Sequence, residues 1–180
     1  MGLFDKGFEE IFSSQMFSIA GGIIAGVLLA AYVDKIILIP GMLILLPGFL
    51  EMRGNISSSL ASRLSSGMFL GVVNPGKIWT KITKGNLLAS FFLVIVVSVT
   101  LGIMAFLFSL FILGMAVPGI ILLSLTAALI ANAIEIPLTV AFTFYLFRKG
   151  HDPNNVMGPF VTTTGDLTSV VALLIALVII

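Results

Sequence analysis

The chain has 180 residues, of which 59% are hydrophobic and only 9% charged, and its mean hydropathy is +1.22. A soluble domain has about 25% charged residues, so this composition predicts an integral membrane protein, long enough for about five or six spans of about 20 residues. The net charge of +1 does not support nucleic-acid binding, and the lack of cysteines excludes disulfides and thiolate metal sites.

The first fifteen residues have an amphipathic pattern. One helical face carries the apolar side chains of Phe4, Phe8, Ile11 and Phe12, while acidic and lysine side chains fall mostly on the other face. The pattern predicts a helix over residues 1–15 that lies along the membrane interface. A signal peptide is not predicted, because the segment begins with acids instead of a basic stretch.

Residues 16–180 are expected to form one membrane domain of five spans. The first span, 16–33, contains no charge, and the spacing of its glycines (Gly21, Gly22 and Gly26) is typical of a helix-packing face. The second stretch, 36–73, is too long for one plain span. We therefore expect a tilted helix that is broken near Gly54. Such irregular backbone is tolerated in a membrane where protein or water satisfies its polar groups.

A polar stripe follows one face of this second span. Serines alone would favour close helix packing, but Glu51 and Asn55 lie in the same stripe and favour a face that lines water. Ionisable groups at membrane depth are costly, and they usually face a bundle interior or a watery cavity. At helical spacing the stripe contains Glu51, Asn55, Ser58 or Ser59, Ser62, and Ser65 or Ser66.

Three further spans are predicted over residues 87–112, 119–147 and 153–180. The connector before them places Trp79 among three lysines, as expected at a lipid head-group surface. In the fourth span Glu135 shares a face with Asn132, Thr139 and Thr143. Glu135 is interpreted either as a structural group, paired with Arg53 or protonated, or as part of a transport path.

The fifth span carries a second polar face, which contains Asn155, Pro159, Thr162 and Asp166. Asp166 is about 20 Å from the start of the span, near the middle of the bilayer. Asp152 and Asn155 are expected to shape the cytoplasmic mouth, unless Asp152 serves only to cap the helix.

The distribution of basic residues predicts the orientation. Five spans place the N-terminus, the 74–85 connector and the 148–152 loop on the same side. That side holds Lys6, Lys77, Lys81, Lys84, Arg148 and Lys149, with Arg63 near it, whereas the other side holds only Lys35. The N-terminus is therefore expected to be cytoplasmic and the C-terminus outside.

The intramembrane polar residues predict a site for a hard cation. Glu51, Asn55, Thr162 and Asp166 offer only oxygen ligands, which suit Mg²⁺, Ca²⁺ and Mn²⁺. An alternative is an intramembrane aspartyl protease, because Thr164-Gly165-Asp166 is similar to its motif. Such an enzyme needs a second membrane aspartate, and Asp34 lies at a surface turn. A non-catalytic membrane scaffold subunit is the other alternative.

Two segments of the chain carry distinctive motifs. The first is Pro47…Gly54-Asn55…Leu60-Ala-Ser-Arg-Leu-Ser65, and the second is Asp152-Pro153-Asn-Asn155-Val…Pro159…Thr162-Thr-Thr-Gly165-Asp166-Leu. They resemble the two signatures of the MgtE magnesium transporters, and the first is closer still to the eukaryotic solute-carrier relatives of MgtE. Both segments lie in the expected spans and in the expected order.

The resemblance implies a homodimeric transporter of a divalent cation, most naturally Mg²⁺, in the cytoplasmic membrane, with a pore built from spans two and five. Such a transporter would not be an enzyme, and it would need no cofactor besides the ion it carries. Asp166 would lie on the ion path, with Asn55 beside it and Thr162 in water-mediated contact. Glu51 and Glu135 depart from the family pattern, and each would either bind the ion or carry a proton in exchange.

The resemblance also predicts a difference in regulation. The bacterial transporters carry large cytosolic sensor domains before the membrane part, whereas here only about 15 residues precede the first span. Gating by such domains is therefore expected to be absent or supplied by another chain.

Overall fold

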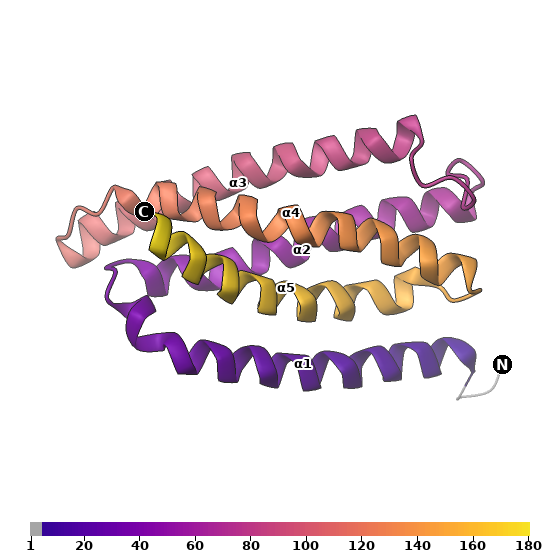
Figure 1. Ribbon diagram of the computed structural model, residues 1–180, viewed down its shortest axis with the longest axis horizontal. Coiled ribbons are helices and arrows are strands. Elements are labelled where there is room, and N and C mark those ends of the chain that lie inside the picture. The colour runs from indigo at the N-terminus through magenta and orange to yellow at the C-terminus, as the bar shows by residue number, and fades with distance from the viewer. Residues whose placement is uncertain (1–4) are drawn as a thin grey trace.

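The computed structural model describes residues 5–180, and over that range the chain is built from helices that run side by side (Figure 1). This confirms the prediction of an all-α fold. Residues 1–4, including Phe4 of the predicted amphipathic face, lie outside the described residues. The helices are α1 (Lys6–Ile37), α2 (Met42–Phe69), α3 (Lys81–Leu113), α4 (Gly119–Arg148) and α5 (Pro153–Ile179).

Successive helices run in opposite directions. The start of α1, the α2–α3 connector and the α4–α5 loop lie at one end of the bundle, and the C-terminus lies at the other (Figure 1). Two hydrogen bonds join the three segments at the first end, which we call the N-terminal end. Lys6 Nζ donates to the carbonyl oxygen of Gly150 over 2.5 Å, and Arg148 Nε donates to that of Pro75 over 2.6 Å.

Side-chain caps fix where three of the helices begin. Asp5 accepts a hydrogen bond from the Phe8 N–H, Thr80 accepts one from Thr83, and Asp152 accepts one from Asn154. Each cap satisfies an N–H group that has no partner inside the helix. Asp152 therefore caps α5, and its expected place at the cytoplasmic mouth stays a prediction.

The first helix is longer than the sequence analysis expects. Residues 6–15 are the first turns of α1 and continue without a break into the expected span at 16–33. No glycine or proline stands between Phe8 and Ala20, so nothing in the sequence interrupts the helix there. At 32 residues α1 is about 48 Å long, which exceeds the roughly 30 Å hydrocarbon layer. Its first turns therefore extend beyond the apolar layer.

The break expected near Gly54 lies elsewhere. The α2 helix is continuous through Gly54 and Asn55, and the chain turns instead at Pro40-Gly41, so that α2 begins at Met42 rather than at residue 36. Gly41 has a φ of 85°, a left-handed conformation that favours glycine. Proline and left-handed glycine together stop a helix, whereas a single helical glycine costs only about 1 kcal/mol.

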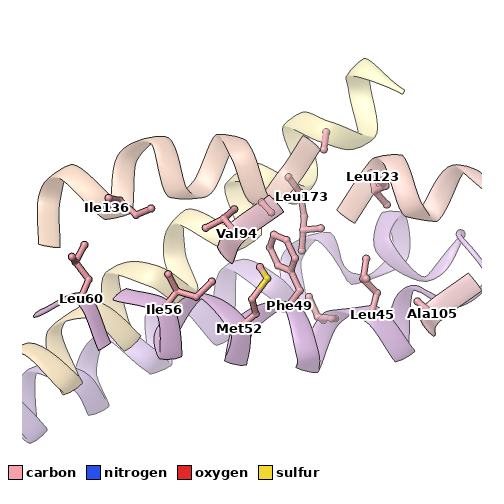
Figure 2. Packing of buried hydrophobic residues seen from close by; sticks show 14 of the residues in the cluster. Leu45, Phe49, Met52, Ile56, Leu60, Val94, Ala105, Leu123, Ile136 and Leu173 are labelled. Carbon is pink, nitrogen blue, oxygen red and sulfur yellow. The ribbon is translucent and has the colours of Figure 1, made fainter. Parts of the chain in front are cut away.

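The core is centred on α2, which packs against α3, α4 and α5. Its buried face carries Leu45, Phe49, Met52, Ile56 and Leu60, spaced at three or four residues. Figure 2 shows these side chains meeting Val94 and Ala105 of α3, Leu123 and Ile136 of α4, and Leu173 of α5. The α1 helix packs mainly on α5.

Among residues 5–180, four helices are long and apolar enough to cross a membrane, namely α1, α3, α4 and α5. The protein is therefore a multi-pass membrane protein. The α2 helix is not among the four, since it carries Glu51, Arg53 and Arg63 together with a run of serines.

Candidate functional site

The two motif-bearing helices, α2 and α5, lie side by side at the predicted polar residues. A methyl group added to Gly54 would lie 3.8 Å from Thr162 Oγ1. One residue earlier, Arg53 Nη1 donates a hydrogen bond of 2.7 Å to Thr168 Oγ1. The centre of the first motif therefore lies at the same level of the bundle as the end of the second.

These helices present polar side chains on the outside of the bundle. Within this set the Asn55 side-chain NH₂ donates to Glu51 Oε1 over 3.0 Å, which leaves the amide oxygen available to a cation. Thr162 Oγ1 donates to the carbonyl oxygen of Gly158 over 3.0 Å. We call this set the α2–α5 polar face, and it consists of Glu51, Asn55, Ser59, Ser62, Thr162 and Asp166. All of these residues are exposed except Asp166, which is partly exposed.

The α2–α5 polar face contains four of the five predicted ion ligands. Asp166 and Glu51 contribute carboxylates, Asn55 contributes an amide and Thr162 a hydroxyl. No three His, Cys, Asp or Glu side chains of residues 5–180 gather in a group that could hold a metal ion.

The fifth predicted ligand, Glu135, lies inside the bundle. Its side chain is fully buried, and its Oε1 accepts a hydrogen bond of 2.9 Å from Thr164 Oγ1 on α5. The residues predicted to share its face, Asn132, Thr139 and Thr143, are also fully buried and donate to backbone oxygens of their own helix. The sequence identified this face correctly, but the face points into the bundle and not toward the α2–α5 polar face.

Arg53 lies in the same interior region and is only 1% exposed. Its guanidinium donates to Thr168, one turn from the Thr164 that Glu135 contacts, and it forms no salt bridge within residues 5–180. Its Nη2 lies 2.5 Å from the position that a Cβ on Gly165 would occupy. A side chain at residue 165 would therefore displace the end of the Arg53 side chain from its present position against α5.

A family model for divalent cation transporters, MgtE, matches residues 46–176. This match covers well over half of the chain and includes both motifs and the whole α2–α5 polar face. The chain belongs to the MgtE family. No curated protein and no solved structure matches it. MgtE proteins are transporters of divalent cations rather than enzymes, so this chain is a membrane transport protein.

This MgtE-family chain has a second polar cluster, at the N-terminal end of the bundle, that sequence reasoning missed. The Glu10 carboxylate accepts hydrogen bonds from Asn155 Nδ2 at 3.0 Å and from the Asp152 N–H at 3.3 Å, and it lies 2.9 Å from His151 Nδ1. Ser14 Oγ donates to the carbonyl oxygen of Asn155. The only signal in the sequence is that acids at the start of the chain stand opposite the basic 148–151 loop.

The cluster changes the acidity of Glu10, which lies in the turns of α1 before the apolar stretch. Burial raises the pKa of the carboxyl, since its side chain is only 9% exposed. Hydrogen bonds from Asn155, His151 and the Asp152 N–H outweigh burial and hold the pKa below the ordinary value of 4.5. Glu10 is therefore an anion at neutral pH and holds the start of α1 on the α4–α5 loop.

Proposed function

We propose that this MgtE-family protein carries Mg²⁺ across the cytoplasmic membrane through a pore at the axis of a homodimer. The observation that carries the proposal is the outward direction of the α2–α5 polar face. Carboxylates at membrane depth are costly when they face lipid. A second copy of the same face, related by a two-fold axis, would cover both faces and enclose a polar path between them.

The same proposal makes α2 the fifth span. At 28 residues it is about 42 Å long, enough to cross the bilayer, and it runs alongside the apolar helices in the bundle (Figure 1). Its polar residues explain why it does not resemble a lipid-facing span. We place the N-terminal end of the bundle in the cytoplasm, because the lysines and arginines concentrate there.

Asp166 is the first ligand in this proposal, followed by Asn55 and Thr162, with Glu51 at the edge of the site. Two copies of Asp166 across the axis would provide two negative charges for one divalent ion. Mg²⁺ keeps several of its waters, so the hydroxyl and amide groups would contact the ion through water. Glu135, which is buried behind α5, would act on the site indirectly.

The test is Mg²⁺ flux into liposomes that contain the purified protein. Asp166→Asn is expected to abolish the flux, whereas Asp34→Asn, the same substitution at an exposed position, is expected to leave it unchanged. Repeating the assay with a pH gradient separates a channel from a proton-coupled carrier. If correctly folded wild-type dimer shows no divalent flux, the transport proposal is wrong, and the chain is better explained as a scaffold subunit.

A further inference from the structure

The interior of the bundle holds a cationic side chain that no part of the ion path explains. Arg53 is 1% exposed and projects from α2 toward α5, where its Nη1 donates to the Thr168 hydroxyl. A guanidinium keeps its proton in proteins, so Arg53 is a permanent positive charge. A buried charge is costly unless an opposite charge compensates it.

Two carboxylates are placed to compensate Arg53, and they differ in what surrounds them. Glu135 on α4 is fully buried and is bonded to Thr164, one turn before Thr168 on α5. Asp166 lies between those threonines in the sequence and is partly exposed on the α2–α5 polar face. Arg53 and Glu135 therefore contact threonines one turn apart on α5, with Asp166 between them in the sequence. Arg53 forms no direct salt bridge within residues 5–180, so the carboxylates would compensate its charge from a short distance.

This arrangement creates a competition for Asp166. If Asp166 were the only acid near Arg53, its negative charge would be taken up by the guanidinium and would attract a divalent cation weakly. A second carboxylate behind α5 removes this conflict, because it supplies the negative charge that Arg53 requires. The Asp166 carboxylate then remains free to face the ion path.

We propose that Glu135 and Arg53 are positioning residues that set the ion affinity of the site, with Glu135 neutralising Arg53 so that Asp166 stays available to a divalent cation. This inference rests on the proposed transport function and assigns a role to two residues outside the α2–α5 polar face. It predicts effects of opposite sign from two substitutions. Loss of the Glu135 charge weakens ion binding, and loss of the Arg53 charge strengthens it.

The experiment compares Glu135→Gln, Glu135→Asp, Arg53→Gln and the double variant Arg53→Gln/Glu135→Gln with the wild type in the liposome assay. We expect the Mg²⁺ KM to rise in Glu135→Gln and to fall in Arg53→Gln, each by roughly tenfold or more. At an effective dielectric of about 20, two unit charges about 12 Å apart already change an equilibrium by about tenfold. Glu135→Asp, which keeps the charge, and the double variant, which removes both charges, are expected to stay within about threefold of the wild type by the same argument. Glu9→Gln, at an exposed position on α1, is the control.

A purely structural role would give a different pattern. Poorer packing would reduce the amount of folded protein and the maximal flux in every variant, without moving KM in opposite directions, and the shorter Glu135→Asp side chain would be at least as harmful as Glu135→Gln. The affinity is also measured from the dependence of the melting temperature on Mg²⁺, so that a folded variant with slow flux still reports it. The double variant leaves no uncompensated buried charge, which makes it the variant best able to fold.

The outcomes separate the two proposals. Wild-type flux together with an unchanged KM in Glu135→Gln and Arg53→Gln overturns this inference alone. The same holds if both variants shift KM in the same direction. Absence of wild-type flux overturns the transport function and this inference with it.

Discussion

The Glu10 carboxylate on α1 accepts a hydrogen bond of 3.0 Å from the Asn155 side chain on α5, across 145 residues of sequence. Asn155 belongs to the second motif, whereas Glu10 lies outside the range that matches the MgtE family model. The bond therefore connects a segment beyond the matched range to the entrance of the proposed ion path. The first turns of α1 are held in place by this cluster.

We expect Glu10→Ala to release the start of α1 from the α4–α5 loop. Three hydrogen-bonding groups lose their shared acceptor, which favours local opening by about 1–3 kcal/mol. The chain has no cysteine, so a single Ser14→Cys substitution at a 7% exposed position gives a background-free probe. Maleimide labelling of this cysteine should become several-fold faster with Glu10→Ala. The exposed neighbour substitution Glu9→Ala should leave the rate unchanged, and an equal rate in all three proteins would contradict the assignment.

Acidification should release the same segment. Hydrogen bonds hold the pKa of Glu10 below 4.5 in the folded protein. The ionised carboxylate therefore stabilises the docked state at any pH above the pKa of the unfolded chain. That stabilisation is lost as the pH falls through the lower pKa of the folded protein. Lys6 at 3.9 Å and His151 are the charged or titratable groups that contact this carboxylate. The Ser14→Cys labelling rate, relative to a model thiol, should rise only below about pH 4.5. In Glu10→Gln that rise should be absent; if it persists, another group causes the release.

Packing of α1 on α5 depends on one of its glycines. A Cβ on Gly21 would collide with the Thr163 methyl group, while one on Gly22 would meet nothing within 4 Å. Overpacking costs about 1–3 kcal/mol, whereas alanine is favoured over glycine in a helix by about 1 kcal/mol. Gly21→Ala should therefore melt at a lower temperature in detergent than Gly22→Ala, by the equivalent of about 1–3 kcal/mol.

The control for this comparison removes the obstacle. Adding Thr163→Ala should restore much of the stability lost in Gly21→Ala, since the colliding methyl group is gone. The cost of that second change is small, because Thr163 Oγ1 is buried with no hydrogen-bond partner within residues 5–180. Equal melting temperatures for Gly21→Ala and Gly22→Ala would show that α1 does not pack on α5 through Gly21.

Helical periodicity was enough to predict the polar faces. Glu51 and Asn55 stand four residues apart and are joined by a hydrogen bond, and Glu135 and Thr139 share a buried face as their spacing indicated. Periodicity did not predict where the helix breaks, because residues that interrupt helices occur at two places, Pro40-Gly41 and Gly54. The left-handed conformation of Gly41 shows which site breaks the chain, and α2 tolerates Gly54 within its packed length.

The contacts that join distant segments were not predictable from periodicity. A pattern places Arg53 and Glu135 on faces of their own helices, but it does not say which neighbouring helix each face meets. Arg53 turns away from Glu51 and Asn55, although all three lie within five residues, because 3.6 residues per turn place it on the other side of α2. The role of Glu10 could be recognised only from the fold, because the fold brings the α4–α5 loop to the start of α1.

The proposed dimer gives the last prediction. A single cysteine at Ser59, on the α2–α5 polar face, should be cross-linked to the same residue of a second protomer by a short bifunctional reagent in the membrane. A single cysteine at Val96, an outward and 45% exposed residue of α3, should not, because α3 faces lipid in this arrangement. If α2 and α5 line the path, Mg²⁺ should slow the modification of Thr162→Cys by a small water-soluble thiol reagent and leave Val96→Cys unaffected. Cross-linking at Val96 in place of Ser59 would put the dimer interface on α3, and the α2–α5 polar face would then need a different partner.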